Sequence, residues 1–551
     1  MKLMLYNSSG KNKTVYKNIG YFDNSGSYRK NIKILGLGNS KILEEKNPEY
    51  ESIIKSLITN YDEKVDVVYL KSKIEQALNQ KQTSWKTKNA AIELIMNFID
   101  EHNIFESINV GKHKGMKEIL CYQISKRISE PQSIFQNFLN RNENIYELDY
   151  SKNSFYRMFD VLLKSKNKIL KKINEINNKK PDINDKNIMF FDSTTIYFES
   201  FTKDGLKHPG YSKDGKFKED QIVLAMACDT NGIPIHYKVF VGNTADVKTL
   251  IPFISEVKDL YPNKKVIVVS DRGMSSAENI KFLEKNKIDY IISYRAKVAS
   301  KKYKEYLLQE SDYIWIHPTF KLKEKESAVA HRKSENVVYK RKQVITWSQS
   351  RAFMDKNKRE NEINNFIKNQ DKKGRVNVKK MIGFSKSKYF KNLGDSIFVL
   401  DEEKVRKDEE FDGYYVYETS LINLPALDVV DIYAMQWKIE ENFRTLKNTL
   451  SIRPMYVYTD NHIEGYILFS FLTLFIFRYL SYKIKEFYKN NGVIQKITDD
   501  SMVDVFRNME YIVEENNFTK TNIQKFKSEN ELSKISWSVY NDYYKYIKSN
   551  K

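Results

Sequence analysis

The sequence predicts an α/β fold: a mixed sheet built from two parts of the chain, with a mainly helical N-terminal region and a helical C-terminal tail. Three observations predict this arrangement. Apolar strand-like runs alternate with amphipathic helical stretches over residues 186–300, and the alternation resumes over 411–490. Between them, residues 301–410 are charged and weakly periodic, as in an inserted domain. Residues 1–185 and 491–551 carry mainly helical patterns.

The length and charge of the chain indicate several domains and an anionic partner. Its 551 residues predict about three or four domains. Lys and Arg total 92 against 71 for Asp and Glu, a net charge of +21 that is spread along the chain. Such a charge favours nucleic acid, because a basic surface attracts phosphate. The alternative is a solvated surface that is merely rich in lysine.

Cysteine usage and hydropathy predict a cytoplasmic protein. The two cysteines, Cys121 and Cys228, have no CxxC spacing, and histidines are few, which argues against a zinc site or a disulfide scaffold. The segment MKLMLYNSSGKNK has no hydrophobic core of signal-peptide length. The most apolar run, Tyr466 to Phe477, is shorter than the roughly 20 residues that a membrane span needs, so we expect a buried helix and no membrane partner.

The N-terminal region divides into a short β part and a longer helical part. Residues 1–40 contain alternating segments such as TVYKNIGYF, which predict a small β element. Residues 47–180 predict helices. The last of these, VLLKSKNKILKKINEI, has a lysine-rich face that either contacts DNA or is ordinary solvated surface.

The central region predicts a sheet of mixed direction. IMFFDSTTIYF and the two runs of QIVLAMACDTNGIPIHYKVFVG, joined at Asn231 and Gly232, predict three antiparallel strands. Two further strands, VIVVSD and DYIISYR, are each preceded by a helical segment, which favours parallel pairing. This order fits a ribonuclease-H-like layer, in which ligands gather at the carboxyl ends of the strands.

Two aspartates stand within or at the end of these apolar strands. Asp192 interrupts the first strand, and Asp271 closes the fourth. An unpaired buried carboxylate is costly, so each side chain is expected to meet a cation, a donor cluster or an open sheet end. The alternatives are local: Asp192 capping a turn beside Ser193 and Thr194, and Asp271 capping a helix that begins near Ser275.

A third acid, Glu440, lies in the helical segment DIYAMQWKIEENFRTLKNTL. Tyr433, Trp437, Glu440, Arg444 and Lys447 recur at steps of three and four residues, so we expect them on one helix face. The alternative is an exposed, merely solvated face.

Three acids from three distant segments are suited to Mg²⁺, which prefers oxygen ligands and keeps several waters. Two Mg²⁺ ions roughly 4 Å apart cleave or transfer phosphodiesters, one activating the attacking oxygen and one stabilising the leaving oxygen. Mn²⁺ is expected to substitute. Trp315 and Trp347 in the inserted segment either stack on an unpaired base or pack in a core, and packing is favoured. Asp229 and Asp246 are expected to be a turn residue and a helix cap.

Together these motifs resemble the DDE transposases of bacterial insertion sequences, in the group whose third acid lies in a Tyr-x2-Arg-x3-Glu-x6-Lys helix. Tyr433, Glu440 and Lys447 match this pattern, whereas Gln436 stands at the arginine position. The segments DSTTIYFES, GYSKDGKFKEDQIVLAM, VFVGNTAD, SDRGM and YYVYETS are also similar to that group. The resemblance covers residues from about 186 to 480.

The resemblance implies a ribonuclease-H-like catalytic core over 186–300 and 411–490 and an enzyme that binds inverted repeats of double-stranded DNA, cleaves them and joins them to a target. It implies a homodimer that acts on the nucleoid in the cytoplasm, with DNA-end binding by residues 1–185 and dimer contacts by 491–551. Asp192, Asp271 and Glu440 would hold the metal ions. The implied DNA-binding residues are Tyr433, Lys447, Gln436, Arg272 and Arg444. The phosphate contact of the missing arginine would pass to Lys438 or Arg444, and Arg272 has an ion pair with a carboxylate as its alternative.

Two other functions stay open. FFDSTTI is similar to the strand and nucleophile of haloacid-dehalogenase phosphatases, but Thr194 stands where that family needs a second aspartate. The other possibility is a catalytically inactive, DNA-binding transposase relic, which Gln436 suggests. Activity on small phosphate esters without DNA would favour the phosphatase.

Overall fold

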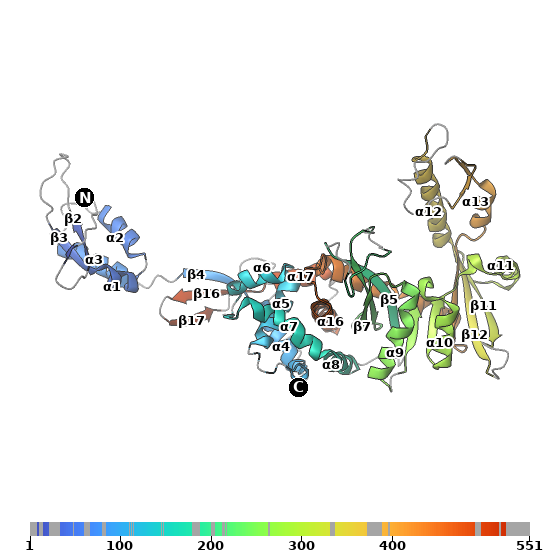
Figure 1. The fold of residues 1–551 in the computed structure, drawn as a ribbon, viewed down its shortest axis with the longest axis horizontal. Coiled ribbons are helices and arrows are strands. Elements are labelled where there is room, and N and C mark those ends of the chain that lie inside the picture. The colour runs from blue at the N-terminus through green and yellow to red at the C-terminus, as the bar shows by residue number, and fades with distance from the viewer. Residues whose placement is uncertain are drawn as a thin grey trace. The chain divides into compact units, whose positions relative to one another are not determined.

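The computed structural model forms two compact units, one of residues 1–88 with 511–526 and one of residues 89–510 with 527–551 (Figure 1). The residues that the structure describes are 8–9, 15–20, 33–47, 49–59, 67–79, 84–109, 111, 113, 115–144, 146, 148–178, 188–199, 204–211, 215, 218–262, 265–330, 337–371, 388–394, 397–490, 498–516 and 519–524.

The first unit contains the small β element expected over residues 1–40. An antiparallel sheet joins β1 (Ser8–Ser9), β2 (Val15–Gly20) and β3 (Lys33–Asn39). Helices α1 (Ser40–Lys46), α2 (Tyr50–Thr59) and α3 (Val67–Asn79) bury an apolar cluster between them.

The C-terminal tail is not helical throughout, which corrects the prediction. After α17 (Asp499–Arg507), the chain forms β16 (Glu510–Asn516) and β17 (Thr519–Gln524), which pair in the order β17-β16-β4 with β4 (Ser84–Asn89). The stretch EYIVEEN contains Tyr, Ile and Val in succession, residues that favour a strand, and its pairing with β4 and β17 gives it that structure. Residues 525–551 lie outside the described part.

The N-terminal part of the second unit is helical, as predicted, and surrounds one long helix. This long helix is α16 (Asp460–Asn490), which packs against α7, α5 and β7. The helices of this part are α4 (Ala91–Glu101), α5 (Met116–Ser129), α6 (Ile134–Leu139), α7 (Lys152–Lys164) and α8 (Lys166–Asn178).

Helix α16 contains the apolar run Tyr466 to Phe477. It is the one helix in the described ranges that is long and apolar enough to cross a membrane, and 94% of its most apolar window is buried inside the protein. The prediction of a buried helix is therefore confirmed.

A nine-stranded mixed sheet forms the centre of the second unit, in the order β10-β11-β12-β15-β9-β8-β5-β6-β7. As predicted, β5, β6 and β7 are antiparallel, and β8 and β9 run parallel to β5. Their bounds are β5 Ile188–Tyr197, β6 Gln221–Cys228, β7 Pro234–Val241, β8 Ile267–Ser270 and β9 Asp289–Ser293.

The segment expected as an insertion extends this same sheet. β10 (Ile314–His317), β11 (Phe320–Val329) and β12 (Tyr339–Ser348) join it through β15 (Tyr414–Thr419). Its remaining elements are α11 (Lys301–Leu308), α12 (Gln349–Ile367), β13 (Phe390–Asn392), β14 (Phe398–Leu400) and α13 (Glu402–Glu409), and a small apolar cluster joins the last four of these.

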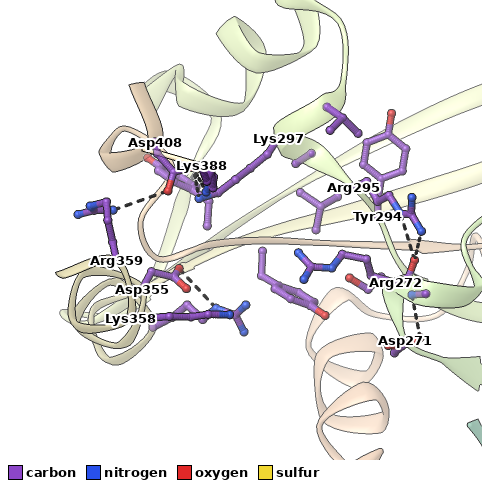
Figure 2. A pocket seen from close by; sticks show the side chains of 18 of the residues that line it. Asp271, Arg272, Tyr294, Arg295, Lys297, Asp355, Lys358, Arg359, Lys388 and Asp408 are labelled. Atoms are coloured by element: carbon purple, nitrogen blue, oxygen red, sulfur yellow. Dashed lines mark hydrogen bonds and ion pairs between the residues drawn. The ribbon is translucent and has the colours of Figure 1, made fainter. Parts of the chain in front are cut away.

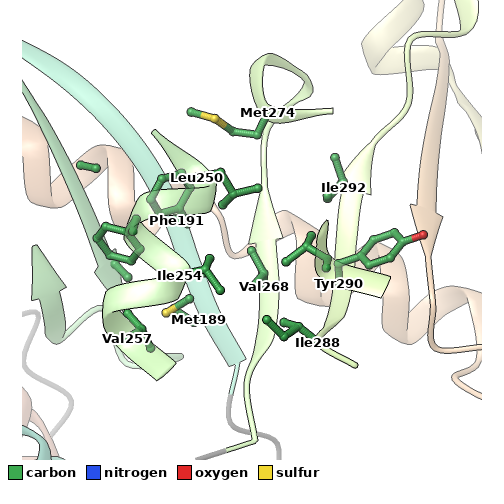
Figure 3. Close-up of a cluster of buried hydrophobic side chains, with 14 of the residues drawn as sticks. Met189, Phe191, Leu250, Ile254, Val257, Val268, Met274, Ile288, Tyr290 and Ile292 are labelled. Carbon is green, nitrogen blue, oxygen red and sulfur yellow. The ribbon is translucent and has the colours of Figure 1, made fainter. Parts of the chain in front are cut away.

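One apolar core lies between one face of the sheet and two helices, α9 (Leu250–Leu260) and α10 (Ala277–Lys285). Figure 3 shows Met189, Phe191 and Val268 packed with Leu250 and Ile254. Because strand side chains alternate between faces, Met189 and Phe191 fix which side of the sheet each residue of β5 occupies.

The segment with the third acid is not one continuous α-helix, contrary to the prediction. It consists of α14 (Ala426–Ala434), α15 (Trp437–Arg444) and a π-helical turn (Thr445–Thr449). The break falls at Met435 and Gln436, where the sequence has no helix-breaking Gly or Pro. The expected single face is therefore divided among three elements.

Candidate active site

Asp192 and Asp271 lie side by side on neighbouring parallel strands. Phe191 of β5 is the register partner of Ser270 of β8, so the next residue on each chain is one of the two aspartates. Adjacent strands lie about 4.8 Å apart, so the backbones of the two aspartates are neighbours. Phe191 points into the core beside α9, so Asp192 must point to the opposite face.

The burial pattern of β5 sets Asp192 apart from its neighbours. Nine consecutive residues of this strand, Ile188 to Ile196, are buried except Asp192, which is half-buried. The backbone N–H of Ser193 donates to Asp192 Oδ1 over 2.7 Å. This hydrogen bond is a local contact of the kind that the capping alternative expects. It does not explain why Asp192 is partly exposed while the residues on both sides of it are buried.

Asp271 is exposed at the end of β8, where the chain turns. Its Oδ1 accepts the backbone N–H of Gly273 at 2.8 Å, which caps the short turn Arg272–Met274. The following helix, α10, has its own cap, Ser276, so the alternative of Asp271 as the cap of that helix is wrong.

Glu440 is exposed in the first turn of α15, and this helix packs on β5 and β6. The buried side of α15 consists of Ile439, Asn442 and Phe443. The structure thus pairs Asp192 with Asp271 and places Glu440 on the helix that packs on the strand of Asp192. Among the described residues, no three His, Cys, Asp or Glu side chains gather into a ready-made metal shell, so convergence of all three acids stays a prediction.

Tyr433 borders Asp271 but is packed among other tyrosines. Its hydroxyl lies 2.9 Å from that of Tyr415, and its ring centroid lies 4.9 Å from that of Tyr417. Burial raises the pKa of Tyr433, and the charges of Tyr415 and Asp271 raise it further. Tyr433 therefore connects the acidic pair to strand β15.

The arginine position of the motif lies in the interior. Gln436 is 6% exposed, and its Oε1 is one of the buried acceptors in the described residues that have no hydrogen-bond partner. Lys438, expected as a substitute for the arginine, instead donates to the carbonyl of Thr230 in the β6–β7 turn. It holds α15 against the sheet, and burial lowers its pKa.

The remaining basic residues of the predicted site differ in their surroundings. Arg444 is exposed and pairs with Glu441 at 3.7 Å. Lys447 is half-buried in the π-helical turn. Arg272 is exposed, and no carboxylate of the described residues lies within 4.0 Å of its guanidinium, so its ion-pair alternative is not observed.

The two tryptophans lie on different strands of the sheet, Trp315 on the edge strand β10 and Trp347 on β12. Trp315 is 53% exposed, so the packing interpretation is wrong for it, while Trp347 is half-buried and donates to the carbonyl of Asp412 at 3.1 Å. Their rings meet edge to face at 5.9 Å.

Of the two aspartates that were left out of the site, one has the predicted role. Asp229 Oδ1 accepts two backbone N–H groups of the β6–β7 turn, from Asn231 and Ile233. Asp246 is no helix cap: its Oδ1 accepts the hydroxyl of Ser193 at 2.9 Å, beside Asp192.

The region that contains these three acids is similar to a known protein family. A family model for the transposase DDE domain matches residues 183–476, just over half of the chain. The chain belongs to this family. The match includes Asp192, Asp271 and Glu440 and implies DNA transposition in a family that cleaves DNA with metal ions.

The transposase domain also has weak likenesses among solved structures. A piggyBac transposase synaptic complex with hairpin DNA gives a TM-score of 0.36 at 10% identity, covering 76% of this chain and 78% of that one. A Mos1 transposase paired-end complex with the left transposon end gives 0.14 at 15% identity, covering 48% and 79%. At these scores the likeness supports no inference about the site. No curated protein matches the sequence.

One residue that sequence reasoning missed fixes the third acid's helix in the transposase domain. The buried guanidinium of Arg478 in α16 donates to Asn442 Oδ1 at 2.8 Å, to Thr445 Oγ1 at 2.6 Å and to Asp499 Oδ1 at 2.7 Å. Asn442 in turn donates to the carbonyl of Gly232 at 2.8 Å. A lone arginine in the apolar run FIFRYL was the available signal, because a buried cation needs partners.

Proposed function

We propose that this protein is the DNA transposase of an insertion sequence, which binds the terminal inverted repeats and catalyses Mg²⁺-dependent cleavage and strand transfer. The observation that carries the proposal is the pairing of Asp192 with Asp271 in adjacent register, on the sheet face opposite the α9 core, in a chain of the transposase DDE family. Helix α15, which packs on β5, supplies Glu440 as the third acid.

The side chains present fit the metal ion that the proposal requires. Asp192, Asp271 and Glu440 offer only carboxylate oxygens, the donors that Mg²⁺ prefers, and Mn²⁺ takes the same ligands. Two such ions, when bound, would activate the attacking oxygen and stabilise the leaving oxygen at phosphorus. The strand register keeps the two aspartates adjacent, and the Arg478 cluster keeps α15 in place.

The other residues of the predicted site are assigned to DNA. Lys447 and Arg444 follow Glu440 along the chain, and Arg272 follows Asp271, so these cations are suited to phosphates on either side of the scissile bond. Tyr433 sits beside Asp271 and would contact the same DNA strand as Arg272. Gln436, which is buried, supports α15 from inside rather than gripping DNA.

The partners follow from the charge and from the reaction. A net charge of +21 favours double-stranded DNA, both element ends and target, on the nucleoid in the cytoplasm. Joining two ends requires at least a homodimer, for which residues 491–551 are the proposed contact, while residues 1–185 bind the ends.

The test is a cleavage assay with the full chain, Mg²⁺ and DNA that carries the flanking ends of its own gene. The expected result is metal-dependent nicks at the 3′ ends, lost in EDTA and restored by Mn²⁺. Hydrolysis of small phosphate esters without DNA would instead favour the phosphatase alternative. Binding of the ends without cleavage in either metal would favour the inactive relic.

A further inference from the structure

A cavity of about 740 Å³ opens beside Asp271 and extends to helix α12 (Figure 2). Asp271, Arg272 and Ser293 line it where β8 and β9 finish, and Arg351 and Lys358 of α12 line it as well. Tyr415 lies on its wall, and its hydroxyl bonds to that of Tyr433 beside Asp271. The cavity is therefore continuous with the proposed active site.

The lining of this cavity is basic. Seven basic side chains face four acidic ones, a difference of +3. The basic ones are Arg272, Arg295, Lys297, Arg351, Lys358, Arg359 and Lys388, and the acidic ones are Asp271, Asp355, Glu362 and Asp408. An excess of cations in a concave site attracts anions, because the walls exclude water and concentrate the field.

At one side of the cavity the charges neutralise each other. Arg359 makes two bonds of 2.7 Å to Asp412, and Asp408 accepts from Lys297 at 3.0 Å and from Lys388 at 3.1 Å. This network joins α12 to α13 and has carboxylates for each of its cations. It is a structural element that leaves little charge for a ligand.

The other cations lack such neutralisation. In the described residues no carboxylate lies within 4.0 Å of the Lys358 ammonium or of the Arg272 guanidinium. Arg295 donates to the carbonyl of Arg272 at 3.2 and 3.1 Å, an uncharged partner. Cations without anions in a cavity are suited to phosphate, which accepts several charge-assisted hydrogen bonds.

Arg351 gives a second indication that the cavity is suited to an anion. Its guanidinium lies over the ring of Tyr415 at 4.5 Å, and its Nε is buried without a hydrogen-bond partner among the described residues. Asp355, one turn away on the same helix, approaches this Nε only to 3.6 Å. A planar cation fixed by stacking, with an unused donor, is preorganised for a phosphate oxygen.

We propose that this cavity is a second phosphate-binding subsite, in which Arg351 and Lys358 of α12 hold the backbone of the DNA strand that leads away from the scissile phosphate. The proposal rests on the proposed function, since the strand must pass Asp271 to reach α12. The ligand is a phosphodiester backbone. Base identity plays no part, because the polar groups that line the site are suited to phosphate oxygens.

The experiment compares Lys358→Ala with Lys356→Ala on the same helix. Both lysines are exposed, but Lys356 does not line the cavity and pairs with Glu360 at 3.9 Å, so it controls for the loss of charge. The probe is a fluorescent duplex that carries one end flanking the gene, titrated by anisotropy at several salt concentrations. Lys358→Ala should weaken binding and lower the slope of log affinity against log salt by about one unit.

Replacing single phosphates of the duplex by uncharged methylphosphonates identifies which phosphate Lys358 contacts. A duplex with single methylphosphonates at successive positions beyond the scissile phosphate should bind wild type less well at one or two positions, and Lys358→Ala should be insensitive there. For cleavage, Lys358→Ala should raise KM with little change in kcat, because its contact is made equally in ground and transition states.

The outcomes separate this subsite from the proposed function. If wild type binds and cleaves the duplex but both lysine variants lose equally, or if no methylphosphonate position depends on Lys358, the subsite is wrong and the transposase assignment stands. If wild type neither binds nor cleaves the duplex, the proposed function fails and the subsite fails with it. Competition by inorganic phosphate alone at cellular concentrations would also overturn the assignment to DNA backbone.

Discussion

The two halves of the nine-stranded sheet differ in the polarity and the burial of their side chains. Strands β5, β6, β8 and β9 are almost entirely buried and apolar, whereas β10 is exposed along its whole length. In β11 the core positions include Lys321 and Lys323, which are 5% and 2% exposed. The first half holds the acidic pair, and the second half adjoins the basic cavity.

The difference shows two ways of covering the face of a sheet. In the first half, apolar side chains fill the space between the sheet and α9, and within β5 only Asp192 and the terminal Tyr197 are partly exposed. In the second half, lysine ammonium groups lie over aromatic rings: Lys323 Nζ lies 4.2 Å from the ring centroid of Tyr306 and 4.3 Å from that of Tyr313. Its ammonium donates to the carbonyls of Tyr306 and Gln309, and no carboxylate of the described residues lies within 4.0 Å of it.

The largest expected difference in stability is between an apolar residue of the first half and one at the edge of the second. Phe191 is fully buried, with its ring centroid 4.7 Å from that of Phe253, so Phe191→Ala should cost about 3–5 kcal/mol. Ile316 of β10 is 48% exposed, and Ile316→Ala should cost less than about 1 kcal/mol. Urea unfolding midpoints measure both; equal losses would remove the distinction between the two halves.

An intermediate effect is expected from the ionic cluster of the first half. Burial alone would raise the pKa of Glu256, but its contacts with His236 and Lys238 and the charges of His236 and Lys166 lower it to about 2. A lowered carboxyl pKa stabilises the fold above its usual 4.5, and the contribution is lost as pH falls towards 2.

Glu256→Gln should therefore cost about 2 kcal/mol at neutral pH, and the difference from wild type should shrink between pH 4.5 and 2. Unfolding free energies measured across this range test it. A difference that stays constant down to pH 2 would show that Glu256 acts by packing rather than by charge.

The smallest effect is expected at Lys323 in the second half. Burial lowers the pKa of Lys323, so the unfolded chain binds more protons than the folded one between the lowered value and the usual 10.5. Stability of wild type should consequently rise with pH in that alkaline window. Lys323→Met should change stability by less than about 1 kcal/mol and abolish that part of the rise. A steeper rise in the variant would contradict this account of the second half.

The same contrast explains how much could be predicted from the sequence. The mixed order of β5 to β9 and the placement of Asp192 and Asp271 followed from apolar runs whose interruptions are conspicuous. The charged segments KLKEKES and YKRKQV predict an insertion, whereas the structure has them in the sheet as parts of β11 and β12. Aromatic rings from α11 and neighbouring segments cover the buried lysines of β11, and the sequence gives no local signal of these contacts.

Other differences came from tertiary contacts that leave no local signal. The break between α14 and α15 has no helix-breaking residue, and Gln436 is buried there by the packing of both helices. The strands after α17 form because they pair with β4, which lies more than 400 residues earlier in the sequence. The spacing of Tyr433, Glu440 and Lys447 predicted one continuous helix, and it gave no indication of the three-part geometry of this segment.

The most direct test of the central claim is strand cleavage and DNA-end binding by Asp192→Asn, Asp271→Asn and Glu440→Gln, with Asp229→Asn of the β6–β7 turn as the control. Each of the three should reduce the Mg²⁺-dependent cleavage rate about a thousandfold, a loss of roughly 4 kcal/mol of transition-state stabilisation, and leave end binding nearly unchanged. The control should cleave at close to the wild-type rate. Retained cleavage in any of the three, or loss of end binding in all of them, would contradict the account.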